Sequence, residues 1–408
     1  MVHTAYIVEA VRTAGGRKNG RLAKWQPSDL AGEVLKELVR RTGVNPEDID
    51  DVILGCVSQV GSQSGNLGRN AVLAAGLPES VPGTTVDRQC GSSQQAVHFA
   101  AQAVMSGVQD IVIACGVEVM SRVPIGASVV DGLKNGHGRA EDALGLKERY
   151  GEDVAFSQFE GAELVAERFK VSRSEIDAFA AASHAKALSA TKRGLFKKEI
   201  LPVKGFDPKT GKEVVHDTDE GIRPETTVET LAKLPTLKKG GIMTAGSASQ
   251  ICDGAAGILI VNEAGLKKLG KSVRPRAKIH TLALAGSDPI MMLAGPIPAT
   301  KNALKRAGLS IHDMDLYEVN EAFGSVPLAW AKEVGASLDK LNVNGGAQAL
   351  GHPLGATGCK IMTTLLYELE RRGGKYGLQA ICEGGGTANA TIIEIIPEAE
   401  GKKIASKL

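Results

Sequence analysis

The sequence predicts an α/β protein made of two similar halves, with a long segment inserted into the first half. Apolar runs typical of strands alternate with helix-like segments at the spacing of βαβ units, which pair their strands in parallel. This alternation stops at about residue 122 and resumes at Ile258–Val261. A sequence pattern of the first half then returns after residue 273, which indicates an internal duplication.

The elements of the first half follow from the spacing of their apolar residues. Leu30, Val34, Leu35 and Leu38 recur with the period of a helix. Residues 12–27 are rich in Gly, Arg and Lys and predict a loop. The expected strands are Ala5–Val8, Ile49–Val57 and Asp110–Gly116, and the expected helices are Leu30–Arg41, Gly68–Ala75 and Gln94–Ser106.

Residues 122–242 are charged and rich in Gly, Pro and Lys, with helical pieces near Gly161–Phe169 and Arg173–Thr191. Long insertions in α/β enzymes usually shape a binding site, so we expect an inserted domain over the sheet layers. The predicted organisation is an N-terminal half at 1–121, completed by about 242–272, a loop domain at 122–241 and a C-terminal half at 273–408.

Two pairs of matching segments support the duplication. Arg41–Asp50 resembles Arg306–Asp315, and Ile113–Gly116 resembles Ile381–Gly384. Both pairs occur in the same order and about 265 residues apart, which favours duplication over chance. The two sheets are expected to pack around shared central helices, with the site where strand ends of both halves meet.

Composition excludes several classes of protein. Lys+Arg 48 against Asp+Glu 46 leaves a net charge of +2, so no global basic field calls for nucleic acid or an anionic membrane. The six cysteines form no CxxC pair and have no His partners at zinc spacing, so we expect no metal site, no disulfide framework and a reducing compartment. The apolar runs are far shorter than the roughly 20 residues that span a bilayer.

The chain ends in Ser406-Lys407-Leu408, which matches the peroxisomal address read by an import receptor. The tripeptide follows a charged stretch after the last expected strand, so exposure is expected. The alternative is an accidental tripeptide in a bacterial protein, which would then be cytoplasmic. We expect the peroxisomal address.

Cys90 is the first candidate for chemistry. It lies in Thr84–Ala96, where a β-branched run ends and an alanine-rich helix begins. Free N–H groups and the positive end of the helix dipole can lower the pKa of such a thiol from about 8.5 toward neutral. The alternative is a small buried hydrophobe, as most free cysteines are.

The second half supplies three further candidates. Asn320, in Val319–Phe323, follows an expected strand, although a simple helix cap is an alternative. His352 lies in a glycine-rich loop before an expected helix over Cys359–Glu370, where core packing does not explain it. Cys382 precedes the glycine turn that begins at Gly384.

Two thiols and an imidazole suit acyl transfer. The Cys90 thiolate can attack a thioester carbonyl while His352 takes the proton, and Cys382 can move a proton at the carbon beside a carbonyl. Backbone N–H groups at Cys90 and Gly384 can hold the oxyanion, a device worth roughly 3–4 kcal/mol per donor.

Four motifs together resemble the signature motifs of the thiolase family, in family order and spacing over nearly the whole chain. They are Arg-Gln-Cys90, Asn320-Glu-Ala-Phe, Gly-His352-Pro and Cys382-x-Gly-Gly-Gly. The resemblance implies a five-layer αβαβα fold of two similar halves, a loop domain, and a homodimer or homotetramer. It also implies 3-ketoacyl-CoA and acyl-CoA substrates, coenzyme A as co-substrate and no tightly bound cofactor.

The resemblance also implies residue roles. Cys90 becomes acylated, His352 activates it and shares one oxyanion site with a water held by Asn320, and Cys382 is the acid/base at the α-carbon. The N–H groups of Cys90 and Gly384 form the second oxyanion site. In the loop domain and beside it, Arg223 and Ser249 match positions that contact coenzyme A.

The departures from the family pattern bear on substrate. Short-chain acetoacetyl-CoA-forming thiolases have a His-Met pair where this chain has Ser157-Gln158, and a missing methionine would open the acyl pocket. Gly91 and Glu383 also differ from commoner residues, with no expected effect on chemistry. We therefore expect thiolytic cleavage of medium, long or branched 3-ketoacyl-CoA in β-oxidation.

Three other functions are compatible with parts of this sequence. A biosynthetic acetoacetyl-CoA thiolase would use the same residues for a Claisen condensation of two acetyl-CoA. A ketoacyl synthase resembles this fold but lacks the second catalytic cysteine, so Cys382 argues against it. An inactive acyl-CoA or sterol carrier would need no activated nucleophile, which the four intact motifs disfavour.

Overall fold

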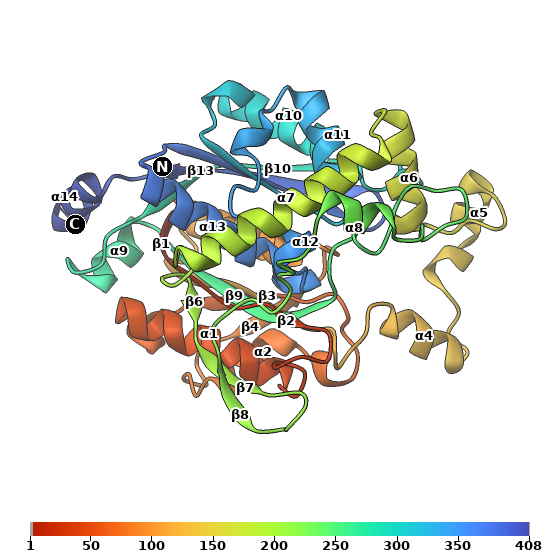
Figure 1. Cartoon of the computed structure of the whole chain (residues 1–408). Helices are drawn as coiled ribbons and strands as arrows, with labels where there is room; N and C mark the ends of the chain where they lie inside the picture. Colours follow the sequence, from red (N-terminus) through yellow and green to blue (C-terminus); the bar gives the residue numbers. More distant parts are fainter. Residues whose placement is uncertain (1–2, 408) are drawn as a thin grey trace.

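The structure, a computed structural model, describes residues 3–407 (Figure 1). The strands are β1 (Tyr6–Thr13), β2 (Gly16–Arg17), β3 (Asp51–Gly55), β4 (Gly83–Val86), β5 (Ile111–Val119), β6 (Ile200–Leu201), β7 (Val203–Phe206), β8 (Glu213–His216), β9 (Cys252–Val261), β10 (Ala277–Gly286), β11 (Leu316–Val319), β12 (Tyr376–Glu383) and β13 (Thr387–Ile395). The helices are α1 (Pro27–Thr42), α2 (Leu67–Ala74), α3 (Ser92–Ser106), α4 (Ala127–Lys134), α5 (Leu144–Tyr150), α6 (Gln158–Arg168), α7 (Arg173–Lys192), α8 (Val228–Ala232), α9 (Glu263–Leu269), α10 (Pro296–Ala307), α11 (Ser325–Val334), α12 (Ala347–Leu350), α13 (Thr357–Arg372) and α14 (Glu398–Lys407).

The elements stack in five layers, αβαβα, as expected. Helices α1 and α2 cover the outer face of β1, β3, β5 and β9 and share an apolar core with them. Helices α3 and α13 lie between the strands of the two halves and bury apolar side chains against both (Figure 1). Helices α10 and α11 cover the outer face of β10 to β13. The predicted helical stripe of α1 is buried along its whole length.

The sheet is mixed, which corrects the expected parallel arrangement. Pairing is parallel between β3 and β4, β3 and β5, and β11 and β12. It is antiparallel where β9 meets β1 and β5, and where β13 meets β10 and β12. The reason at β13 is local, because Gly385 and Gly386 (both φ 77°) turn the chain straight back from β12. Strand β9 runs antiparallel to β5 because the chain enters it from the long inserted segment and not from a βαβ crossover.

The sequence predicted two separate sheets, one for each half, and the structure corrects this prediction. Strands β1 and β10 pair antiparallel through Tyr6–Lys278 and Ile7–Ala277. This short seam joins the halves into one path, β11-β12-β13-β10-β1-β9-β5-β3-β4, of an 11-stranded sheet. Two residue pairs contribute little stability to the contact between the halves, so side-chain interactions must also join them.

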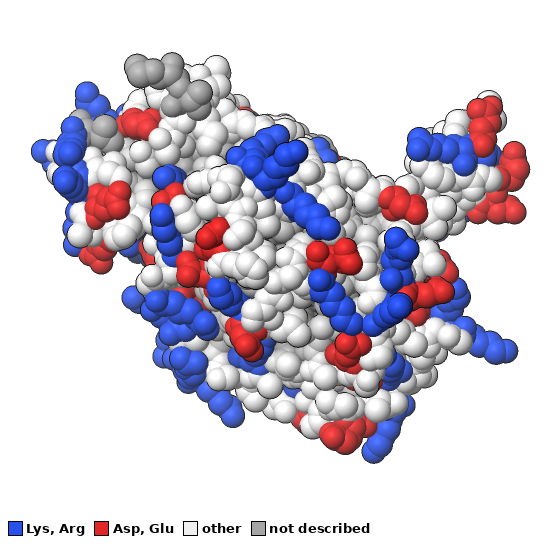
Figure 2. All heavy atoms as spheres, turned by 90° about the horizontal axis from the view of Figure 1, so that it is seen from above, with Lys and Arg blue, Asp and Glu red and all other residues white. Residues whose placement is uncertain are grey.

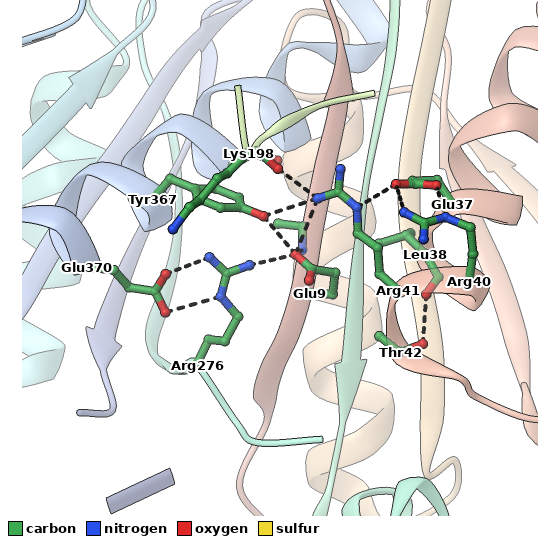
Figure 3. A network of polar contacts seen from close by, with 12 residues as sticks. Glu9, Glu37, Leu38, Arg40, Arg41, Thr42, Lys198, Arg276, Tyr367 and Glu370 are labelled. Carbon is green, nitrogen blue, oxygen red and sulfur yellow. Dashed lines mark hydrogen bonds and ion pairs between the residues drawn. The ribbon is translucent and has the colours of Figure 1, made fainter. Parts of the chain in front are cut away.

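A polar network beside the seam makes that contribution (Figure 3). Arg276, which precedes β10, donates to Glu370 of α13 and to Glu9 of β1, both at 2.6 Å. Its guanidinium lies 4.1 Å from the ring centroid of Tyr367, whose hydroxyl donates to Glu9 at 3.0 Å. Arg41 of α1 extends the network through Tyr367 at 3.2 Å. Elements of both halves therefore share one set of ion pairs.

The inserted segment between β5 and β9 carries α4 to α8 and β6 to β8. Helices α4 and α5 project from the body of the molecule, while α6 and α7 pack on α11 and α12 of the second half (Figure 1). Buried Arg12 of β1 anchors this segment, because it donates to Glu199 at 2.6 Å and to Asp219 at 2.9 and 3.1 Å. The boundaries 122–241 for a loop domain stay a prediction.

The surface carries charges of both signs. Figure 2 shows Lys and Arg interspersed with Asp and Glu over the face seen from above, in keeping with the net charge of +2. Within residues 3–407, no helix has the length and apolar character needed to cross a bilayer. Ser406 and Lys407 end α14 and are exposed, and Leu408 lies outside the described residues.

Candidate active site

Cys90 lies at a tight turn between β4 and α3. Gln89 has a positive φ of 48°, which is uncommon for a residue other than glycine. Its N–H donates to Asp87 Oδ1 at 2.7 Å, and Ser92 Oγ donates to the Gln89 carbonyl at 2.6 Å. Ser92 Oγ also accepts from the Arg88 N–H at 3.0 Å. These bonds hold the half-buried Cys90 just ahead of the helix.

His352 is buried in the loop before α13, and its neighbours define its protonation. The Thr357 hydroxyl donates to the Pro353 carbonyl at 3.0 Å, so its oxygen accepts from His352 Nδ1 at 2.5 Å. This assigns the proton to Nδ1 and leaves the lone pair on Nε2, which lies 3.3 Å from Asn320 Nδ2. The imidazole can therefore accept a proton at Nε2.

The backbone around His352 is held by Lys360, which is buried, and by the Gln250 carbonyl. Lys360 of α13 donates from Nζ to the carbonyls of Leu350 at 2.5 Å and Gly351 at 2.9 Å, directly before the histidine. The His352 N–H donates to the Gln250 carbonyl at 3.1 Å. Because Lys360 bonds two successive carbonyls, the loop before His352 has little conformational freedom. The imidazole is therefore held in place before any substrate binds.

Glu118, at the end of β5, ties the first half to the histidine loop. Its buried carboxylate accepts from the N–H groups of Val57 and Ser58, both at 3.0 Å, and of Gly355 at 2.9 Å. Gln63 Nε2 donates to it at 2.7 Å. Burial raises the pKa of Glu118, and these four donors counter that effect.

The starts of α3 and α13 lie side by side. The Cys359 N–H, in the first turn of α13, donates to Ser93 Oγ in the first turn of α3 at 3.0 Å. Cys90 and His352 each precede one of these two helix starts, so the internal duplication places the thiol and the imidazole at the same end of the central layer.

Cys382 and Gly384 reach the same region from β12. Cys382 is buried in an apolar cluster with Phe323, and its pKa is raised well above the usual value by burial and by Cys90 nearby. A Cβ at Gly384 would lie 2.9 Å from Gln89 Oε1, so this glycine contacts the Cys90 turn. Within residues 3–407, the N–H groups of Cys90 and Gly384 donate no backbone hydrogen bond outside the regular helices and strands.

The resting thiol is neutral, and the expected lowering of its pKa is wrong. Burial, followed by the Glu383 carboxyl, raises the pKa of Cys90 to about 12. A helix N-terminus is worth about 0.3–1 kcal/mol, less than one pKa unit, which burial outweighs. Burial and then Lys360 lower the pKa of His352 to about 3, so the imidazole is neutral as well. Proton transfer must therefore accompany attack.

The two residues expected to contact coenzyme A differ in their setting. The Ser249 N–H donates to the Ala322 carbonyl at 2.9 Å, which places Ser249 beside the Asn320 motif. Arg223 is exposed, and its guanidinium forms no hydrogen bond or ion pair with the rest of residues 3–407. Its backbone N–H donates to His184 Nδ1 at 3.1 Å.

Sequence reasoning missed three residues that position the site. Thr357 was quoted only as part of the glycine-rich loop, although a hydroxyl five residues after His352 is a usable signal. Glu118 is the one carboxylate in the buried run Ile111–Val119, which itself indicates a satisfied internal acid. Lys360 lies on the buried face of α13, and a lysine at such a position likewise indicates a buried charge with partners inside the protein.

The duplicated α/β fold brings Cys90 close to Cys382 and sets the starts of α3 and α13 side by side, an arrangement of thiols and an imidazole that suits acyl transfer. Family models agree: the thiolase N-terminal domain matches residues 5–264 and the thiolase C-terminal domain matches residues 273–395. The chain belongs to the thiolase family and is an acyltransferase.

Several known proteins resemble this chain over nearly its whole length. It is 50% identical over 391 residues, 96% of this chain and 94% of the relative, to steroid 3-ketoacyl-CoA thiolase FadA6 of Mycobacterium tuberculosis. It is 44% identical over 397 residues (95% and 98%) to 3-ketoacyl-CoA thiolase of Aliivibrio fischeri. The crystal structure of the Bacillus anthracis acetyl-CoA acetyltransferase has a TM-score of 0.85 at 37% identity, covering 97% of this chain and 99% of that one.

The Thr357 hydroxyl offers a test of the histidine's positioning. We expect Thr357→Val to lower kcat by about 10- to 100-fold with little change in KM, because the imidazole loses the contact that fixes its tautomer and orientation. Thr357→Ser, which keeps the hydroxyl, should restore most of the rate. Thr363→Val is the matched control, since the buried Thr363 hydroxyl, within the part of the chain that the structure describes, bonds only the Cys359 carbonyl of α13. Equal losses in both valine variants would contradict this assignment.

Proposed function

We propose that this enzyme cleaves 3-ketoacyl-CoA with coenzyme A, giving acetyl-CoA and a shortened acyl-CoA, through an acyl-enzyme on Cys90. The step belongs to β-oxidation. The family is established by the domain matches, and the degradative direction is supported by relatives named 3-ketoacyl-CoA thiolase at 43–50% identity. The biosynthetic reaction, two acetyl-CoA condensing to acetoacetyl-CoA, is the second candidate, because a relative named acetyl-CoA acetyltransferase is 44% identical.

The observation that carries the substrate class is the apolar cluster beside Cys382, which we propose as the lining of the acyl site. Helix α6 begins after Ser157, whose Oγ accepts from the Glu160 N–H at 3.4 Å, and it buries apolar residues in one cluster with Cys382 and Phe323. Phe159 lies edge-on to Phe323 with ring centroids 5.6 Å apart and is half exposed. With Ser157-Gln158 in place of a His-Met pair, this lining supports a medium, long, branched or steroid-linked acyl chain.

Our proposed chemistry balances with the groups present. Cys90 Sγ bonds to C3 of the 3-ketoacyl-CoA while its proton passes to Nε2 of His352, and the C2–C3 bond breaks. The electron pair stays on C2 of the leaving acetyl-CoA, which takes the proton of Cys382. The thiol of the incoming coenzyme A gives its proton to Cys382, and its sulfur takes the acyl group from Cys90. His352 then returns its proton to Cys90.

Backbone and surface groups support the same proposal. The N–H groups of Cys90 and Gly384 are suited to one oxyanion, and Nε2 of His352 with a water on Asn320 to the other. The unpaired Arg223 suits a phosphate of coenzyme A, and Ser249 is its proposed companion. No cofactor beyond coenzyme A as co-substrate is needed for these steps.

We also propose a homodimer or homotetramer in the cell. Strand β4 ends the strand order of the sheet, and an edge strand supports pairing with a second copy. The relatives reported above come from bacteria, which supports a cytoplasmic location over a peroxisomal one. Light scattering on the purified protein tests the oligomeric state.

Thiolysis assays across acyl lengths test the function. We expect turnover of C8 to C16 or branched 3-ketoacyl-CoA to exceed that of acetoacetyl-CoA by about tenfold in kcat/KM, the effect of roughly 1.4 kcal/mol of added apolar contact in the transition state. Strict preference for acetoacetyl-CoA would assign the biosynthetic reaction instead. If thioesters bound and none was turned over, the protein would be an inactive acyl-CoA or sterol carrier instead.

A further inference from the structure

Glu383 is a buried carboxyl next to both proposed reactive thiols, and the chemistry above does not use it. It follows Cys382 at the end of β12 and is fully buried. Its Oε2 accepts from the Thr387 hydroxyl at 2.7 Å, across the hairpin to β13. Its Oε1 has no hydrogen-bond partner among residues 3–407. A buried, half-unpaired acid is costly, so this position calls for an explanation.

The unpaired oxygen faces the residue that follows Cys90. A Cβ at Gly91 would lie 2.0 Å from Glu383 Oε1, so only glycine admits the carboxyl in this place. The Gly91 carbonyl is in turn held by Asn389 Nδ2 at 3.1 Å. Gly91 and Glu383, the two residues that follow the proposed reactive thiols, both depart from the commoner family residues, and the structure fits one against the other. Their pairing sets the carboxyl against the Cys90 turn.

The charged and titratable groups near this carboxyl are Asp87, Arg88 and Cys90 of the turn before α3, and Cys382 of β12. Burial is the main cause that raises the pKa of Glu383 to about 8; the Thr387 hydroxyl and Arg88 act to lower it, and Asp87 raises it. Arg88 has its own Nε buried without a partner in residues 3–407. The Glu383 carboxyl is in turn the largest cause, after burial, of the raised pKa of Cys90.

We propose that Glu383 is a positioning residue that controls the Cys90 thiol by its own protonation: the neutral carboxyl permits thiolate formation, and the ionised carboxyl opposes it. The proposal deepens the function above and rests on Cys90 as its nucleophile. Two negative charges so close in a buried site repel each other strongly, whereas a neutral acid does not. The working form of the enzyme is therefore the protonated one, and Glu383 gives the reaction an upper pH limit.

Alkylation of Cys90 by iodoacetamide measures this directly and requires no acyl-CoA. In the wild-type enzyme, the logarithm of the rate should rise with pH up to about 8, flatten over about one pH unit as Glu383 ionises, and then rise again. In Glu383→Gln, which keeps the shape without the charge, the rise should continue. At pH 9.5 the variant should react about tenfold faster, the effect of one pKa unit on the thiol. Peptide mass mapping confirms that the adduct is on Cys90.

Glu37→Gln is the matched control, since Glu37 is a carboxylate of α1 in the network of Figure 3 and, among residues 3–407, its side chain bonds only Arg40 and Arg41. Its alkylation profile should follow the wild type. The proposal is overturned by a straight wild-type profile between pH 7 and 10, or by equal profiles in wild type and Glu383→Gln. The wild-type profile decides the matter even if the variant fails to fold. A thiolytically inactive wild type would remove the proposed function without touching this result.

Discussion

Cys90→Ala is expected to abolish thiolysis, with a loss of about 10⁴-fold or more in kcat. No other thiol is expected to replace it, because Cys382 is assigned to the proton at the α-carbon and the other four cysteines are buried. Intact-mass measurement after incubation with an acyl-CoA should show an acyl adduct on the wild type and none on the variant. Cys115→Ala is the control: this buried thiol of β5 packs in the outer core, and its removal should leave the adduct in place.

Cys382→Ala separates the two thiols by role. Acylation of Cys90 by a simple acyl-CoA requires no proton transfer at an α-carbon, so this variant should still form the adduct. Cleavage of a 3-ketoacyl-CoA does require that proton, so thiolysis should fall by about 10²- to 10⁴-fold. An adduct that persists in Cys90→Ala, or one that disappears in Cys382→Ala, would reverse the proposed assignment.

Arg12→Met is expected to lower the free energy of unfolding by about 3–5 kcal/mol. The guanidinium is fully buried and is bound by Glu199 and Asp219, which are buried as well. Burial alone would raise the pKa of Asp219, but Arg12 holds it below its usual value, so the carboxylate stays charged. Without Arg12 two buried acids lose their cation. Urea unfolding of the purified variant measures the loss.

A triple variant and a surface control sharpen this test. Arg12→Met combined with Glu199→Gln and Asp219→Asn should recover a large part of the lost stability, because the charges disappear together. Arg17→Met should change stability by less than about 0.5 kcal/mol, since Arg17 is exposed and lies 4.0 Å from Glu220. A loss below about 1 kcal/mol in Arg12→Met would contradict the role assigned to this cluster.

Periodicity and the placing of glycines predicted alternating strands and helices in two halves, and the five layers were implied by the resemblance to the thiolase family. The helical stripe of α1, the uniformly apolar β5 and the glycine turn after Cys382 each carry a local signal, and each lies where it was expected. Strand pairing could not be predicted in the same way. The direction of β9 depends on the path of the inserted segment, and the β1–β10 seam joins residues more than 260 positions apart in the sequence.

The candidate site shows the same division. Cys90, His352 and Cys382 stood out because each interrupts a local pattern. The groups that position them come from the opposite half, as Glu118 does for Gly355 and Ser93 does for Cys359. The pKa of Cys90 failed as a prediction for the same reason, since burial and Glu383 are supplied by distant parts of the chain. The local sequence identifies the candidate reactive residues, whereas contacts between distant parts of the chain determine their pKa values and orientation.

The central position of β1 has a consequence for synthesis of the chain. This first strand is flanked by β9, which begins at Cys252, and by β10, which begins at Ala277. At about 5–20 residues per second, the ribosome takes roughly 12–50 seconds to deliver the first of these partners. Before that, β6 can pair with β1 at Arg12 and Thr13, so most of both hydrogen-bonding edges of β1 stays open, and a nascent chain shorter than about 260 residues cannot complete even its first half. This enzyme should therefore depend on chaperone protection early in translation, and fragments that stop before β9 should aggregate.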